Sequence, residues 1–265
     1  MNSKAKNRNT FRESVLAVVL LFSSIFSYAQ LNSTEKTLLF QRAEAGDAPA
    51  LATLTQYASG GDVSAQVHLA RMNQNARGLA RSESDAIYWY RRASENGSAY
   101  ADNQLGILYC KPWDVLSSHT EAEKWRRKAA EHGNSYFQYD LARDYEGGKH
   151  CMPHDYKQAM QWYLRSADQG NYRAQRAIGI MYSHKEGVSQ DLIAEYKAFF
   201  LARAMYNPAD GNGVYLSDDI TAVANKMSPA QLLLAKEAVT NWVANHSGWE
   251  WCDSQQLYFK PNCPR

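Results

Sequence analysis

The sequence contains little glycine and proline, 15 and 7 of its 265 residues, which argues against long disordered stretches. It lacks the H-E-x-x-H, G-x-S-x-G and phosphate-binding glycine-loop motifs that mark several enzyme classes. Its 29 basic residues nearly balance its 27 acidic residues, so the composition does not indicate nucleic-acid binding. Hydrophobic residues make up 45% of the chain, which is enough to bury a sizeable core.

The N-terminal segment has the pattern of a secretory signal peptide. Its start is basic, with Lys4, Lys6, Arg8 and Arg12. Ser14–Phe26 is apolar but short for a membrane span, and Ser27 and Ala29 are small, as a cleavage site requires. We therefore expect cleavage after Ala29, a periplasmic or secreted mature chain, and no membrane span in it. The alternative interpretation is a buried N-terminal helix.

The chain has four cysteines, all after residue 29: Cys110, Cys151, Cys252 and Cys263. An even number of cysteines in an exported protein indicates disulfides. We predict the pairs Cys110–Cys151 and Cys252–Cys263. The alternative is a metal site, because His150 and His154 flank Cys151, but a structural zinc site needs a better-spaced fourth ligand. We predict no metal and no cofactor.

A unit of about the same length repeats along the chain. Trp89 and Trp125 are 36 residues apart, and Trp125 and Trp162 are 37 apart. A fixed period in this range indicates stacked supersecondary units. Each unit is predicted to contain a first helix (A), a loop and a second helix (B). The A helices are expected near Ala65, Ala101, Phe137 and Ala174, each four residues after a glycine: Gly61, Gly97, Gly133 and Gly170.

The repeated helices have one small or apolar face, as residues 101–109 and 174–182 illustrate. Gly106 and Gly179 cost helix propensity, which makes sense where a ring from the paired B helix needs room. The tryptophans of the B helices are therefore predicted to be core residues. Further helices are expected at 31–45, capped by Ser33 or Thr34, and at 48–59, 217–227 and 229–245, where Ser228 and Pro229 form a helix start.

These motifs resemble the Sel-1-like repeat (SLR) family, in its exported bacterial type, which is related to tetratricopeptide-like solenoids. The closest B helix is Asp155–Gly170, and the closest loop is Gly187–Asp191. The chain departs from the family pattern at Phe137 and at Ala198-Phe199. The resemblance covers roughly residues 46–204. It implies an all-α fold, a right-handed α/α superhelix of helix-turn-helix repeats with a C-terminal capping helix.

We therefore expect a signal peptide over residues 1–29, a repeat solenoid over 30–205, and a helical cap with a disulfide-closed tail over 206–265. The resemblance implies a protein–protein interaction scaffold or adaptor with a protein partner, and not an enzyme. An alternative is an immunity protein that neutralises a type VI secretion effector in the periplasm. The sequence leaves the oligomeric state open.

A further alternative is β-lactam hydrolysis, because some cysteine-rich SLR proteins have been linked to it. Ser33-Thr34-Glu35-Lys36 matches S-x-x-K, the serine motif of penicillin-binding enzymes. The accompanying S-D-N and K-T-G motifs do not occur in the chain. A polar helix start is the better interpretation of these residues.

The partner surface is expected on the A helices, which line the concave groove in related solenoids. By analogy with tetratricopeptide repeats, positions 3 and 7 of each A helix should be exposed. These residues are Val67, Arg71, Asn103, Ile107, Tyr139, Arg143, Arg176 and Ile180. Arginine with tyrosine and asparagine suits recognition of a peptide or a carboxylate. The basic runs Arg91-Arg92 and Arg126-Arg127-Lys128 on B helices are predicted to lie on the solvated convex face.

Overall fold

The computed structural model describes residues 32–110, 118–206, 214–246, 249–251 and 259–261. Its described part is all-α, as predicted, apart from one short two-stranded ribbon. The chain divides between Leu108 and Tyr109 into two compact units, here called unit 1 and unit 2. The predicted signal peptide and the predicted pair Cys252–Cys263 lie outside the described residues. The predicted boundary between solenoid and cap at residues 205 and 206 stays a prediction.

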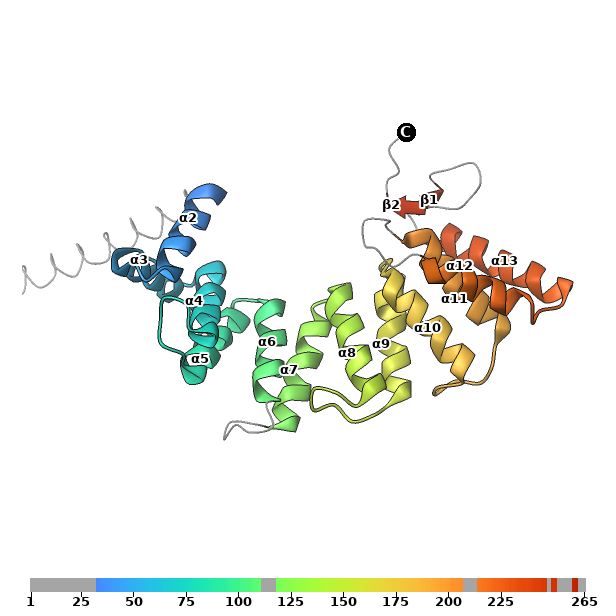
Figure 1. Cartoon of the computed structure of the whole chain (residues 1–265), viewed down its shortest axis with the longest axis horizontal. Helices are drawn as coiled ribbons and strands as arrows, with labels where there is room; N and C mark the ends of the chain where they lie inside the picture. Colours follow the sequence, from blue (N-terminus) through green and yellow to red (C-terminus); the bar gives the residue numbers. More distant parts are fainter. Residues whose placement is uncertain (1–31, 111–117, 207–213, 247–248, 252–258, 262–265) are drawn as a thin grey trace, which may run out of the picture. The chain divides into compact units, whose positions relative to one another are not determined.

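Unit 1 is a succession of helices joined by short turns and, between α4 and α5, by a loop (Figure 1). They are α2 Ser33–Glu44, α3 Ala48–Ser59, α4 Val63–Asn75, α5 Glu83–Glu95 and α6 Ala99–Tyr109, whose last residue begins unit 2. Consecutive helices from α2 to α5 pack on one another. Leu54 and Leu69 are buried at the centre of their shared core, and Trp89 packs against it.

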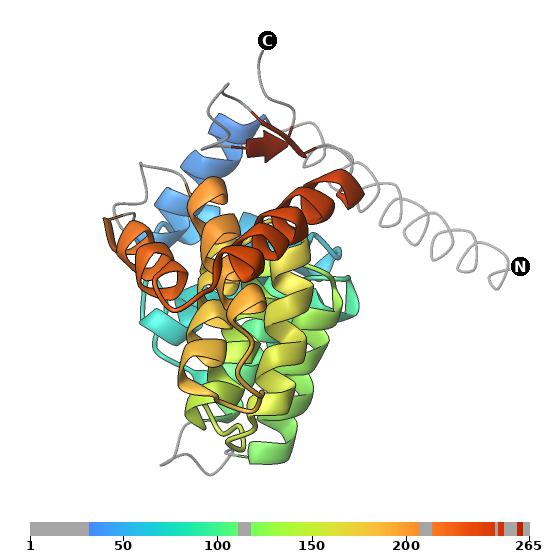
Figure 2. The ribbon, with the colours of Figure 1, turned by 90° about the vertical axis from the view of Figure 1, so that its right-hand side faces the viewer.

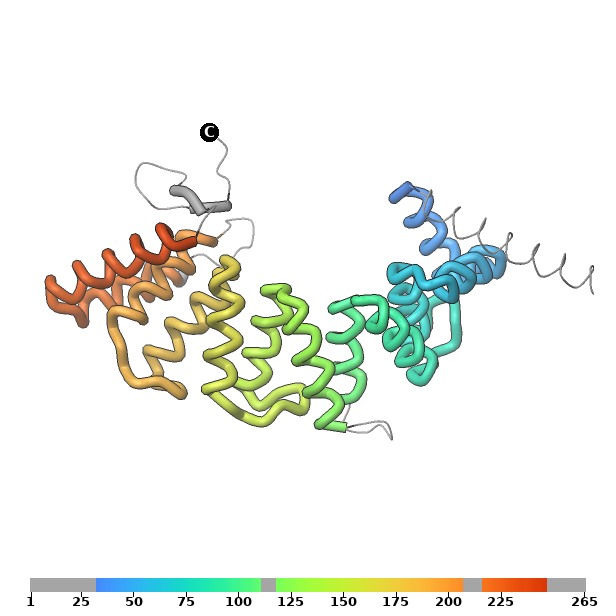
Figure 3. The backbone as a smooth tube through the Cα atoms, turned by 180° about the vertical axis from the view of Figure 1, so that it is seen from behind, coloured from blue at the N-terminus to red at the C-terminus, as the bar shows by residue number. Residues whose placement is uncertain are grey.

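Unit 2 continues the helical pairs and ends in the cap. Its helices are α7 His119–Glu131, α8 Ser135–Gly147, α9 Tyr156–Asp168, α10 Tyr172–His184, α11 Leu192–Met205, α12 Val214–Ala224 and α13 Pro229–Asn245. Figure 3 shows α8, α9 and α10 side by side, and each packs on the next. Trp162 and Tyr163 of α9 are buried at the centre of a core built from α7 to α11.

Short polar residues start these helices because their side chains accept hydrogen bonds from the first free backbone N–H groups. Asp62 accepts from the N–H of Ala65 at the start of α4, and Asn171 accepts from the N–H of Ala174 at the start of α10. The predicted cap of α2 is wrong by one or two positions. Asn32 rather than Ser33 or Thr34 caps this helix, in a reciprocal capping box with Glu35.

Close packing between paired helices explains one of the helical glycines. A Cβ atom at Gly179 of α10 would lie 2.7 Å from the ring of Phe199 on α11, so only glycine fits there. The predicted room for a ring at Gly179 is thus confirmed, although the ring is that of Phe199 and not of a tryptophan or tyrosine. The prediction that the tryptophans are core residues is fully met at Trp162, which is 3% exposed. Trp89 and Trp125 are only half-buried.

The C-terminal part closes the end of unit 2. Figure 2 shows α13 lying across α11, against which it packs. As predicted, Ser228 caps α13 and Pro229 is its first residue, and Gln231 completes a capping box. The strands β1 Trp249–Trp251 and β2 Phe259–Pro261 pair antiparallel, and the sequence pattern did not predict them.

Candidate functional site

A groove of about 700 Å³ lies in unit 2, over α8, α9 and α10. We call it the groove throughout. Its lining is aromatic and charged: Tyr139, Asp140, Arg143 and Glu146 from α8, Tyr163 from α9, and Tyr172, Arg173, Arg176, Ala177 and Ile180 from α10. A and B helices alternate in the stack, so the A helices α8 and α10 present their exposed faces to the same space and α9 contributes one side chain between them.

The arginines of the groove lie beside its tyrosines. The Arg143 guanidinium is 5.7 Å from the centre of the Tyr139 ring, and Arg173 is 5.7 Å from the Tyr172 ring. Such placement over an aromatic face restricts a cation without neutralising it. Arg143 and Arg173 are exposed, and Arg143 has no salt-bridge partner in the described part of the chain. The guanidinium group of Arg143 therefore presents hydrogen-bond donors to the groove, whereas Nε of Arg173 donates to the Tyr172 hydroxyl at 3.2 Å.

The acidic side chains of the groove are less available to a ligand than its arginines are. The Tyr163 hydroxyl donates a hydrogen bond of 2.7 Å to Glu146 Oε2. Burial, followed by the hydrogen bond to Glu146, raises the pKa of Tyr163 far above its ordinary value, so this tyrosine remains a donor. Burial likewise raises the pKa of the Asp140 carboxyl, against the opposing effect of Arg126. The groove is thus better suited to anionic than to cationic ligands.

Four of the eight residues predicted to bind a partner line this groove: Tyr139, Arg143, Arg176 and Ile180. Val67 and Arg71 lie on α4 and Ile107 on α6, in unit 1. Asn103 of α6 was expected to be exposed, but only 8% of it is, because its side of the helix is packed. The repeat register missed Tyr163 and Arg173, since it considered only positions 3 and 7 of each A helix.

The expectation that Arg126 lies on the solvated face is wrong. Arg126 is 4% exposed and forms a buried ion pair with Asp144 of α8. Arg126 directly follows Trp125 in the sequence. In two other repeats the residue that follows the tryptophan is a fully buried tyrosine, Tyr90 after Trp89 and Tyr163 after Trp162. That register was visible in the sequence and could have predicted its burial. Arg127 pairs with Glu123 at 3.0 Å on the same helix.

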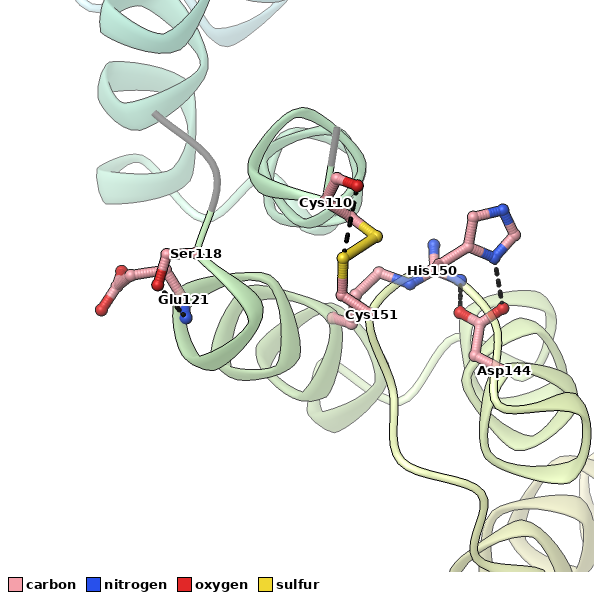
Figure 4. Close-up of a disulfide and its surroundings, with 7 residues drawn as sticks. Cys110, Ser118, Glu121, Asp144, His150 and Cys151 are labelled. Atoms are coloured by element: carbon pink, nitrogen blue, oxygen red, sulfur yellow. Dashed lines mark hydrogen bonds and ion pairs between the residues drawn. A yellow bond between two sulfur atoms is a disulfide. The ribbon is translucent and has the colours of Figure 1, made fainter. Parts of the chain in front are cut away.

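The predicted bond between Cys110 and Cys151 is present, with the two Cα atoms 5.5 Å apart (Figure 4). Cys110 directly follows α6, and Cys151 lies in the loop between α8 and α9. Beside it, His150 Nδ1 is 2.6 Å from Asp144 Oδ1, so the same carboxylate contacts both the loop and Arg126. Cys151 is therefore not available as the metal ligand that the alternative interpretation required.

Two further observations concern a possible metal site and the S-x-x-K residues. Among the described residues, no three His, Cys, Asp or Glu side chains are placed to hold a metal ion. Ser33–Lys36 form the first turn of α2, with Asn32 as the cap and Ser33, Thr34 and Glu35 exposed, which agrees with a polar helix start. No helix in the described ranges is both long and apolar enough to cross a membrane.

The chain carries three Sel1 repeats. The family model matches residues 63–98, 99–134 and 135–171, which places α4 to α9 in the family and confirms the resemblance seen in the sequence. Members of this family are typically non-enzymatic interaction scaffolds. A search of curated proteins found no match.

Two solved structures share the SLR fold. A protective antigen present in uropathogenic Escherichia coli strains is 26% identical, with a TM-score of 0.57 over 83% of this chain and 47% of its own. A Sel1 repeat protein from Oxalobacter formigenes is 28% identical, with a TM-score of 0.53 over 66% of this chain and 49% of its own. The chain thus spans about half the length of either protein.

An immunity protein from Pseudomonas aeruginosa is also similar, at 12% identity and a TM-score of 0.41, over 82% of this chain and 84% of its own. A likeness at this level supports no functional inference. The role of an immunity protein therefore stays a prediction from the sequence resemblance.

Proposed function

We propose that this chain is an exported protein–protein interaction scaffold that binds a protein partner in the groove of unit 2. One observation carries the proposal: Tyr139, Arg143, Arg176 and Ile180, selected from repeat register alone, line a single groove. Arginine and tyrosine are the residue types that dominate interaction hot spots, because they combine contact area with fixed hydrogen-bond donors. The three Sel1 repeats support an interaction role of this kind.

The experiment is affinity capture from periplasmic extract with the mature chain, followed by titration of the identified partner against variants. Arg143→Ala and Arg176→Ala should each weaken binding by about 1–2 kcal/mol without changing the thermal melt. Arg91→Ala and Arg92→Ala on α5 are the matched controls, because they remove the same charge outside the groove. Weaker binding by the controls and wild-type binding by the groove variants would place the working surface on the B helices.

Export forms part of the proposal and rests on the basic and apolar pattern of residues 1–29. The Cys110–Cys151 bond supports it, because disulfides persist mainly in oxidising compartments. Intact-mass analysis of the mature protein from cells should show Gln30 as the first residue. Retention of residues 1–29 in that material would contradict this part of the proposal.

A further inference from the structure

The cap of unit 2 places a carboxylate at the groove. Asp219 of α12 has its Oδ2 atom 3.6 Å from Nε of Arg176, one of the groove arginines. This distance is within range for an ion pair but too long for a hydrogen bond. Asp219 Oδ2 is buried and has no hydrogen-bond partner within the described ranges. One oxygen of the carboxylate is thus shielded from solvent, and the charge of Arg176 lies beside it without a hydrogen bond.

Helix α12 also contributes to the apolar cluster against which the groove residue Ile180 packs. Ile180, which lines the groove one turn after Arg176, packs against the cluster that contains Ile220 and Val223 of α12. Arg176 is therefore paired with α12 by charge, and Ile180 packs against a cluster that α11, α12 and α13 build together. The side chains of the Arg176–Asp219 pair are 41% and 30% exposed, so solvent and a ligand can both reach it.

The remaining charges of the groove favour an anionic ligand. Arg143 and Arg173 are exposed, whereas Glu146 accepts the Tyr163 hydrogen bond and Asp140 is half-buried. The most exposed charged side chains that line the groove are therefore arginines. Carboxylates match the fork of donors on arginine in geometry as well as in charge.

We propose that the groove binds an acidic segment of a protein partner, and that Asp219 occupies the place of one partner carboxylate at Arg176 in the unbound chain. This inference rests on the proposed function. Binding exchanges a loose internal ion pair for a carboxylate that can approach Arg176 to hydrogen-bonding distance. Asp219 thereby lowers the affinity for acidic ligands and excludes segments that are too weakly acidic to displace it.

The test uses the full mature chain and a fluorescein-labelled peptide of alternating glutamate and tyrosine, with fluorescence anisotropy as the readout. A peptide with glutamine in place of glutamate is the ligand control. Asp219→Asn should bind the glutamate peptide about two- to fivefold more tightly, which corresponds to the usual strength of a solvated ion pair. Asp218→Asn is the matched variant, because it removes the same charge from an exposed neighbour on α12.

Two further variants locate the effect. Arg143→Ala should bind the glutamate peptide about five- to thirtyfold more weakly, as expected of a hot-spot arginine. In an Arg176→Ala background, Asp219→Asn should not change the affinity for the glutamate peptide, since the carboxylate then has no arginine with which to pair. Thermal melts of all variants establish that they remain folded.

The outcomes separate this inference from the proposed function. Equal gains from Asp219→Asn and Asp218→Asn would overturn the inference, because the effect would then be one of net charge. Equal binding of the glutamate and glutamine peptides by every variant would overturn the acidic partner. In either case a captured partner that still depends on Arg143 would leave the scaffold function in place.

Discussion

The loop between α4 and α5 in unit 1 and the loop between α8 and α9 in unit 2 occupy the same place in their repeats, yet different chemistry closes them. In unit 1 the Ser82 N–H donates to the carbonyl of Asn73, and Gly78, with φ of 67°, backs onto α2. In unit 2 the Asp155 N–H donates to the carbonyl of Tyr145 in the same way. At the place of the glycine, however, stands His150, with φ of 50°.

The helices that precede these two loops also differ, with an apolar residue in unit 1 where unit 2 has a charged one. Met72 of α4 is fully buried, whereas the matching residue of α8 is Asp144, which pairs with buried Arg126 and with His150. The Cys110–Cys151 bond then holds the loop of unit 2. One repeat is thus closed by apolar packing and a glycine, and the other by an ion pair and a disulfide. The second closure therefore depends on redox state, and the first does not.

The largest effect is expected from breaking the buried ion pair. Asp144→Ala should destabilise unit 2 by about 3–5 kcal/mol, because it leaves the Arg126 charge buried without its partner. The double variant Arg126→Tyr, Asp144→Met restores the residue types of the other repeats and should recover most of this loss. Urea unfolding measures both free energies of unfolding.

Glu95→Gln is the control for this prediction, because it removes an exposed pair with Arg92 at 4.0 Å and should change stability by less than about 0.5 kcal/mol. If Asp144→Ala changed stability no more than Glu95→Gln, the pair would not be the closing element of unit 2.

Removal of the disulfide should have the next largest effect. Cys110 and Cys151 are 41 residues apart, and opening a loop of that length should cost about 3–4 kcal/mol on the chain-entropy model. The double variant Cys110→Ser, Cys151→Ser should show this loss in urea unfolding under oxidising conditions. Non-reducing peptide mapping of the wild type is the independent check, and free thiols at both positions would contradict the bond.

In unit 1 the loop between α4 and α5 depends on Gly78. Gly78→Ala should destabilise by about 2–4 kcal/mol, since a Cβ atom would collide with the carbonyl oxygen of Ala43 and the left-handed backbone is strained for alanine. Gly97→Ala is the matched control, with φ of 86° but open space around its Cβ position. It should show the strain alone, about 1–2 kcal/mol. Equal losses in the two variants would show that the contact with α2 is not tight.

The smallest effect is a pH dependence of unit 1. Burial lowers the pKa of His68 below its ordinary value of 6.5, although Glu44 lies 2.9 Å from its Nε2 and opposes the shift. The unfolded chain therefore binds a proton more readily than the folded one. The stability contributed by neutral His68 is present above pH 6.5 and is lost as the pH falls through the lowered pKa. Over about pH 7 to pH 5, the melting temperature of His68→Gln should depend less on pH than that of the wild type. An unchanged slope would exclude this histidine as the cause.

Several features of this protein followed from the sequence by itself. The period of the tryptophans predicted the helical repeats, because a helix pair cannot bury its apolar face without a neighbour at the same spacing. The same register predicted the room at Gly179 and the bond from Cys110 to Cys151, since stacking brings equivalent parts of successive repeats together. It also predicted four of the ten residues that line the groove, because positions 3 and 7 of an A helix point to one face.

The tertiary structure decided what depends on contacts between elements that share no local pattern. The repeat register places Arg126 at a buried position, but its pairing with Asp144 follows only from the way in which two repeats face each other there. The placement of Asp219 against Arg176 joins residues of α12 and α10 for which no spacing rule exists. Local propensity and periodicity determine which helices form and which face each one buries. Packing decides which side chains meet across those faces, and these pairs follow no regular spacing in the sequence.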